Sequence, residues 1–160
     1  MNDWVDGLTL ATALGCGLMA GVWFAFSAFV MQALERLPTA QGVAAMQSIN
    51  RTAVLPPLMI ALFGVALACL GLIGWSALNW SDARAIWVLA AAVVYLIGTV
   101  GVTIAGNVPL NDALAPLAPH SEAAAREWAH FLDSWTVWNH VRTVTSLVAA
   151  GLLTAGLLQD

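Results

Sequence analysis

Four long stretches without a charged side chain constrain this chain more than any other feature. An apolar helix needs about 20 residues to cross a bilayer, and lipid admits only helices or closed barrels, because every backbone polar group must be paired internally. These stretches are too long for barrel strands, so we expect transmembrane helices at about residues 8–34, 55–78, 86–106 and 137–158. The uncharged stretches themselves are Gly7–Leu34, Thr52–Ser81, Ala85–Asn111 and Thr143–Gln159.

The composition agrees with a membrane location. The chain is 61% hydrophobic and 9% charged, against roughly 45–50% and about 25% in soluble domains. We therefore predict one integral membrane domain over residues 1–160. Its expected fold class is all-α, a four-transmembrane-helix bundle with short amphipathic helices in the first and third connections. We expect a multi-pass protein of the bacterial cytoplasmic membrane, and the first span is too long and follows too acidic a segment for a cleaved signal peptide.

The arginines predict the orientation, because the chain has no lysine. Arg36 and Arg51 fall in the first connection, and Arg126 and Arg142 fall in or beside the third. The positive-inside rule places these connections in the cytoplasm and both termini outside. The net charge of −4 with few basic residues argues against nucleic-acid binding.

Small residues recur every four positions along one face of the first span. Such a face lets a second helix approach closely, which favours packing where lipid removes the hydrophobic drive. The partner is either another helix of the same chain or a second copy in a homo-oligomer. The residues of this face are Ala13, Gly17, Gly21 and Ala25.

Two connections carry amides that suit a ligand, and those of the first connection alternatively form the solvated polar face of an interfacial helix. Gln47 and Asn50 are three apart in a segment that can form a short helix, so they are neighbours on its surface. In "AGNVPLNDAL" we expect Pro109 to break the third helix near Val108. Asn107 and Asn111 lie on either side of this expected break, as caps or as ligand-binding groups.

The segment "WTVWNHVRT", residues 135–143, gathers polar groups at the start of the last span. If residues 122–158 are helical, then Trp135, Asn139 and Arg142 share one stripe and His140 lies on another. Arg142 either reaches lipid head groups or faces inward toward an anionic oxygen. We predict that the first stripe faces residues 107–111 across a pocket.

Aromatic and titratable groups complete the predicted site. We expect three indoles to form the walls of a pocket for a flat ligand, namely Trp23, Trp135 and Trp138. The imidazole of His140 can exchange a proton near neutral pH. It has no partner histidine at metal-binding spacing, so no metal site is predicted.

Four segments carry a resemblance to a known family. They are "GVWFAFSAFVMQALERLP", "GVAAMQSIN", "NVPLNDAL" and "WTVWNHVRT". In this order around four apolar spans, they resemble the DUF1772 or anthrone-oxygenase-like family of small membrane proteins. The chain departs from the family at Gln32 and Leu55, where proline and asparagine are common.

The resemblance implies a function and a set of site residues. Fungal members are associated with the O2-dependent oxidation of anthrones to anthraquinones, generally described without an organic cofactor, whereas most bacterial members have no assigned activity. The residues that match the family pattern are Asn107, Asn111, Asn139, His140 and Arg142.

Three hypotheses for the function remain open. The first is a membrane oxygenase that uses O2 on a phenolic or polycyclic aromatic substrate, with His140 as the base and Arg142, Asn107 and Asn111 stabilising the anion. The second is a binding module for a quinone, haem, a lipid-like ligand or copper. The third is a non-catalytic assembly subunit. We expect no cofactor beyond O2, with haem and copper left open, and partners among apolar aromatic or lipid-like molecules and membrane lipids.

Overall fold

The computed structural model describes residues 3–159, and within this range it contains helices and no strand. Three helical segments follow one another without a break and form the first helical rod: α1 (Asp3–Ala25), the π-helix η1 (Phe26–Val30) and α2 (Met31–Glu35). It is followed by α3 (Thr39–Ala53) and α4 (Pro56–Leu78). The second half consists of α5 (Ala85–Tyr95), the π-helices η2 (Leu96–Gly101) and η3 (Thr103–Asn107), α6 (Val108–Leu114) and α7 (Glu122–Leu157).

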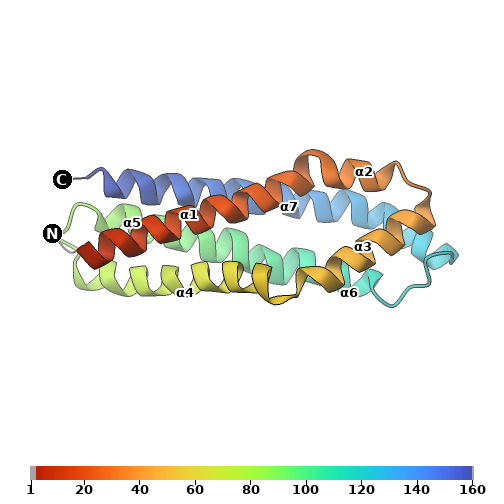
Figure 1. Ribbon diagram of the computed structural model, residues 1–160, viewed down its shortest axis with the longest axis horizontal. Coiled ribbons are helices and arrows are strands. Elements are labelled where there is room, and N and C mark those ends of the chain that lie inside the picture. Colours follow the sequence, from red (N-terminus) through yellow and green to blue (C-terminus); the bar gives the residue numbers. More distant parts are fainter. Residues whose placement is uncertain (1–2, 160) are drawn as a thin grey trace.

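Among the described residues, four helical rods are long and apolar enough to cross a membrane, which confirms the predicted fold class. They lie side by side along the long axis of the molecule, with both termini at one end (Figure 1). The helix expected in the first connection is α3, whereas the helical residues of the third connection directly continue the third and fourth rods. The rods are Trp4–Glu35, Pro56–Leu78, Ala85–Leu114 and Glu122–Leu157.

The rods differ in length, and this difference creates a thicker end. At about 1.5 Å per residue, the 23 residues of α4 span about 35 Å and the 36 residues of α7 about 54 Å. The first, third and fourth rods therefore extend beyond the start of α4. At that end, α3 crosses obliquely and takes the place that α4 leaves (Figure 1).

The expected helix break at Pro109 does not occur. Val108 has helical backbone angles, φ −61° and ψ −46°, and the rod runs unbroken to Leu114. Pro109 is the second residue of α6 and directly follows the π-helix η3. Because the backbone hydrogen bonds change register there, the missing N–H of proline costs little, as it does in the first turn of a helix.

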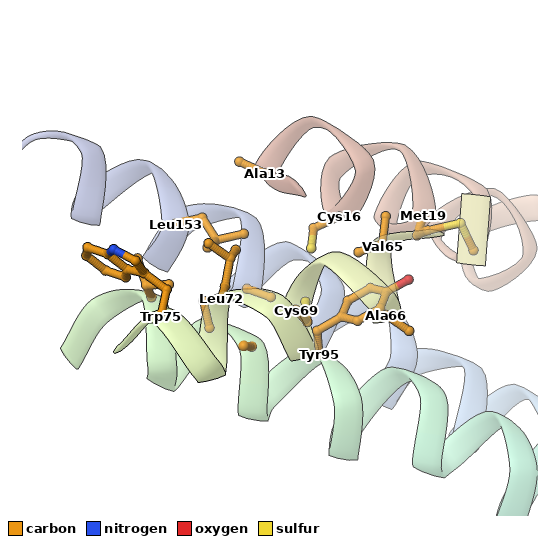
Figure 2. Close-up of a cluster of buried hydrophobic side chains, with 14 of the residues drawn as sticks. Ala13, Cys16, Met19, Val65, Ala66, Cys69, Leu72, Trp75, Tyr95 and Leu153 are labelled. Carbon is orange, nitrogen blue, oxygen red and sulfur yellow. The ribbon is translucent and has the colours of Figure 1, made fainter. Parts of the chain in front are cut away.

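In the half of the bundle where both chain termini lie, the core is built from small and medium side chains of all four rods. Figure 2 shows Cys16 of α1 and Cys69 of α4 between the helices, close to Tyr95 of α5. Both cysteines are free and fully buried. Tyr95 donates its hydroxyl to the main-chain oxygen of Leu62 at 3.4 Å, so its polar atom is paired inside an apolar core.

A second hydrophobic cluster fills the thicker end, under α3. Its centre is a stack of α7 side chains, with ring centroids 5.6 Å apart for Trp128 and Phe131 and 5.9 Å apart for Phe131 and Trp135. Gln47 of α3 is buried and donates to the main-chain oxygens of Leu114 at 3.0 Å and Leu117 at 2.9 Å. Gln47 therefore joins α3 to the end of α6.

In the small-residue face of α1, Ala13 is buried in the core of the chain, whereas the two glycines are not. Gly17 and Gly21 are exposed, and an added Cβ at either would meet nothing within 4 Å. Close helix contact occurs at Gly98 instead, where an added Cβ would collide with the side chain of Thr145 in α7. Packing of the α1 face against a second copy stays a prediction.

Ion pairs join α1 to the connection between α4 and α5, at the end of the bundle where both chain termini lie. Arg84, just before α5, pairs with Asp6 of α1 and with Asp82, the latter at 2.7 Å. Its guanidinium also lies 5.5 Å from the ring centroid of Trp75. The hydrogen bonds from Arg84 lower the pKa of Asp82 to about 2. The start of α1 and the connection between α4 and α5 are thus held together.

Replacing Gly98 by alanine should destabilise the protein, because the new methyl group must displace Thr145 from a tight contact between α5–η2 and α7. Overpacking of this kind costs about 1–3 kcal/mol. Gly17→Ala is the matched control, since nothing lies near that position and alanine favours a helix. Thermal unfolding in detergent should show a lower midpoint for Gly98→Ala only. Equal midpoints for both variants would contradict this packing.

Candidate functional site

Arg142 lies inside the membrane-spanning bundle. Its relative exposure is 3%, so the alternative in which it reaches lipid head groups does not hold. It lies about 22 Å along the axis from Leu157, the last residue of α7, at about 1.5 Å per residue. It lines a cavity together with Leu58 and Leu62 of α4, which places it at the depth of a membrane span.

The guanidinium of Arg142 is held between two indole rings. Its central carbon lies 3.9 Å from the ring centroid of Trp23 and 5.0 Å from that of Trp135. Such cation–π contacts stabilise a desolvated cation by about 2 kcal/mol. One nitrogen donates to Asn139 Oδ1 at 2.8 Å, and another reaches Thr103 Oγ1 at 3.5 Å. Aromatic faces and neutral oxygens therefore surround the charge.

The charge of Arg142 has no acidic partner in the part of the chain that the structure describes. The ion pairs found there involve Arg84 and Arg126. The Nε of Arg142 is buried without any hydrogen-bond partner. An unpaired buried charge is costly, and intramembrane charges usually mark functional positions. The arrangement is therefore suited to receiving an anionic oxygen.

Asn139 accepts a hydrogen bond from Arg142 and thereby fixes the position of its guanidinium. Its amide nitrogen donates to the main-chain oxygen of Trp23 and to Ser27 Oγ, both at 2.7 Å. Because both amide hydrogens are engaged, the side-chain oxygen is held toward Arg142. Ser27 also contacts His140 Nδ1 at 2.8 Å. Ser27 belongs to η1, where the change to π-helical bonding alters the regular hydrogen-bond ladder.

A cavity of about 210 Å³ opens in front of Arg142. Its wall is mainly apolar, and its polar groups come from Asn50, Thr103, Asn111, Arg142 and the two indoles. An apolar protein cavity of about 150 Å³ holds benzene. The larger volume here admits an aromatic molecule of two or three fused rings.

The end of the third rod faces α7 across this site, as predicted for the stripe that contains Trp135. Trp135 Nε1 donates to Asn111 Oδ1 at 2.9 Å, and Asn107 Nδ2 donates to the main-chain oxygen of Trp135 at 3.1 Å. Asn111 lines the cavity. Asn107 lies behind the wall with its Oδ1 buried and unpartnered. The bond to Asn111 fixes the orientation of the Trp135 indole beside the guanidinium.

The predicted site residues fall into three groups. The first supports the cavity wall or the position of α3, the second lies outside the cavity, and the third lines it. Asn107 and Asn139 support the wall, and Gln47 fastens α3. His140 and Trp138 lie elsewhere: both are exposed, His140 borders outer hollows with Ser27, and Trp138 packs on Gly106. The predicted contact of these two side chains with a ligand of this cavity is therefore not supported. The cavity wall contains Trp23, Asn50, Asn111, Trp135 and Arg142.

Two contributors were missed by the sequence analysis, Ser27 and Thr103. Each is a hydroxyl residue within an apolar span, which is a weak signal because helical hydroxyls often bond to their own backbone. Thr103 does so, to the main-chain oxygen of Thr99 at 2.7 Å. Within residues 3–159, no group of three or more His, Cys, Asp or Glu side chains is placed to hold a metal ion.

A family model described as "Anthrone oxygenase" matches residues 46–152, about two thirds of the chain. The match begins in α3 and ends in α7, so it includes Asn50, Asn111, Trp135 and Arg142. No curated protein and no solved structure matches the chain.

Replacing Arg142 by methionine should not lower stability. The substitution removes an unpaired buried charge and keeps a long side chain between the indoles. These gains offset the loss of the cation–π contacts and of the hydrogen bond to Asn139. Asn139→Leu should lower the unfolding midpoint, because it leaves Arg142 and the Trp23 carbonyl without a partner. Thermal unfolding in detergent compares the two. A large loss of stability in Arg142→Met would show that Arg142 has a structural role.

Proposed function

Because the chain belongs to the anthrone oxygenase family, we propose that it is a membrane oxygenase that acts on a phenolic or polycyclic aromatic, anthrone-like substrate with O2. One observation carries the proposal. The Arg142 guanidinium is held between Trp23 and Trp135, lacks an acidic partner among the described residues, and lines an apolar cavity. Such a site complements a flat molecule with a negatively charged oxygen.

The chemistry begins with ionisation of the substrate. Loss of a proton from an activated methylene carbon spreads negative charge onto the oxygen of the conjugated carbonyl group. Arg142 stabilises that charge without reorganisation because its position is fixed. The low dielectric of the cavity strengthens the attraction. The resulting carbanion is rich in electrons, which makes it reactive toward O2.

The proposed oxidation balances without another reductant. The carbanion transfers electrons to O2 and forms a carbon–oxygen bond, which gives a hydroperoxide after protonation. Elimination of water then produces the ketone, so that CH2 and O2 become C=O and H2O. The carbon loses four electrons and O2 gains four. The proton released first is used again in this sequence, so no net proton leaves the site.

His140 is a poor choice for the base, although the sequence favoured it. It is linked to Arg142 only through Ser27 and Asn139, and an amide side chain does not readily carry a proton. No His, Asp or Glu lines the cavity within the described residues. We therefore assign proton removal to a water molecule in the cavity, and Asn139 and Ser27 are positioning residues for Arg142.

The same observation favours a second candidate, a binding module. A cavity without a titratable base can hold an anionic aromatic or quinone-like ligand and leave it unchanged. Binding without O2 consumption would support this candidate.

The proposal predicts O2 uptake when the purified protein in lipid nanodiscs is mixed with anthrone, above the rate with empty nanodiscs. Arg142→Met should lower kcat/KM by about 10²–10³, the usual effect of removing one donor to an oxyanion. His140→Ala should stay within about fivefold, since a general base would contribute about 10²–10⁴. A loss of that larger size in His140→Ala would restore His140 as the base. No uptake by the wild type would overturn the oxygenase proposal.

A further inference from the structure

The cavity is closed at both ends of the bundle. On the terminal side lies the core that contains Cys69 and Tyr95, shown in Figure 2. On the other side lies the cluster with the aromatic stack, in which Trp135 belongs both to the cluster and to the cavity wall. A ligand that travelled along the bundle axis would have to pass through packed side chains. Access must therefore be lateral.

One side of the cavity is open between α4 and the end of the third rod. α4 packs closely on α5, and η3 and α6 pack on α7 instead. The side chains that line the cavity and are also exposed come from the turn before α4, from α4, from η3 and from α6. We call this opening the lateral window, and it consists of Val54, Phe63, Ile104 and Val108.

The lateral window is apolar, and its residues other than Val54 lie in membrane-spanning helices, with Val54 in the turn just before α4. Phe63 is the eighth residue of α4, which begins at Pro56, and Ile104 lies within the third rod, Ala85–Leu114. Exposed hydrophobic side chains at this depth contact hydrocarbon rather than water. The opening therefore connects the cavity to the interior of the bilayer.

The innermost part of the cavity has the opposite character. The Nε of Arg142 and the Nε1 of Trp23 are both buried without a hydrogen-bond partner, and both residues line the cavity. The guanidinium of Arg142, which has no acidic partner among the described residues, matches an oxygen that carries a negative charge. An apolar path that ends at a cation fits an amphiphile with an apolar body and a single acidic oxygen.

We propose that the cavity takes its ligand as the neutral acid from the bilayer, through the lateral window, and binds it as the anion, with the ionised oxygen against Arg142 and the proton released to water. The occupant is a flat aromatic amphiphile of two or three rings. This inference rests on the proposed function for the identity of the site. It adds the route by which the substrate arrives and the orientation in which it is held.

The test follows binding rather than turnover. The probe is 2-naphthoate, and methyl 2-naphthoate is its neutral counterpart with the same rings. The protein is placed in lipid nanodiscs, and stopped-flow records the change in tryptophan fluorescence as the probe reaches Trp23 and Trp135. We expect 2-naphthoate to bind at least about tenfold more tightly than its ester, as a buried charge-assisted contact implies. Arg142→Met should abolish this preference.

The window is tested by narrowing it with a larger side chain. Ile104→Trp should lower the association and dissociation rates of 2-naphthoate together, each by about tenfold. The equilibrium affinity should hardly change, because a narrower path slows movement in both directions. Val54→Trp, on the opposite border, provides a second variant should the first fail to fold. Ile97→Trp is the matched control, since Ile97 is exposed on the same rod and does not line the cavity.

Each outcome decides one part of the inference. Unchanged rates in both window variants would overturn the lateral route, and so would equal slowing in Ile97→Trp. Equal affinity for 2-naphthoate and its ester would overturn the orientation. None of these measurements requires O2. A protein that binds the probe as described and consumes no O2 with anthrone would therefore contradict the oxygenase proposal alone.

Discussion

The burial of Arg142 without an acidic partner among residues 3–159 is the constraint on which the site depends. A guanidinium at membrane depth needs compensation, and here it comes from two indole faces and the amide of Asn139. That compensation requires α1 to supply Trp23 and α7 to supply the other two residues. The position of the charge therefore depends on the close packing of the first rod against the fourth.

The π-helical segments bring the remaining groups to the same depth. η1 contains Ser27, which binds Asn139, and η3 contains Thr103 and Asn107, which face α7. A π-helical turn shifts every following side chain around the helix axis and is frequent at functional sites. Without η3, Pro109 would interrupt the rod that carries Asn111. The local widening thus permits a continuous helix and a polar wall together.

Hydrophobicity alone predicted the number of spans, and helical periodicity correctly grouped Trp135, Asn139 and Arg142. Both signals are local, because each depends on the residues of a single helix. For the small-residue face of α1, the sequence did not decide which neighbour it meets. Gly17 and Gly21 have the spacing of a packing motif, but which glycine meets a neighbour depends on how the rods rotate. The close contact formed at Gly98 instead.

The sequence by itself determined that the chain spans the membrane four times, because uninterrupted apolar stretches have no other stable arrangement in lipid. It also determined that a charged and amide-rich segment begins the last span. Only the tertiary structure decided that Arg142 faces a cavity while His140, two residues earlier, faces outward. The physical reason is that neighbouring helical residues point about 100° apart, and the packing of the other three rods determines which direction is the interior.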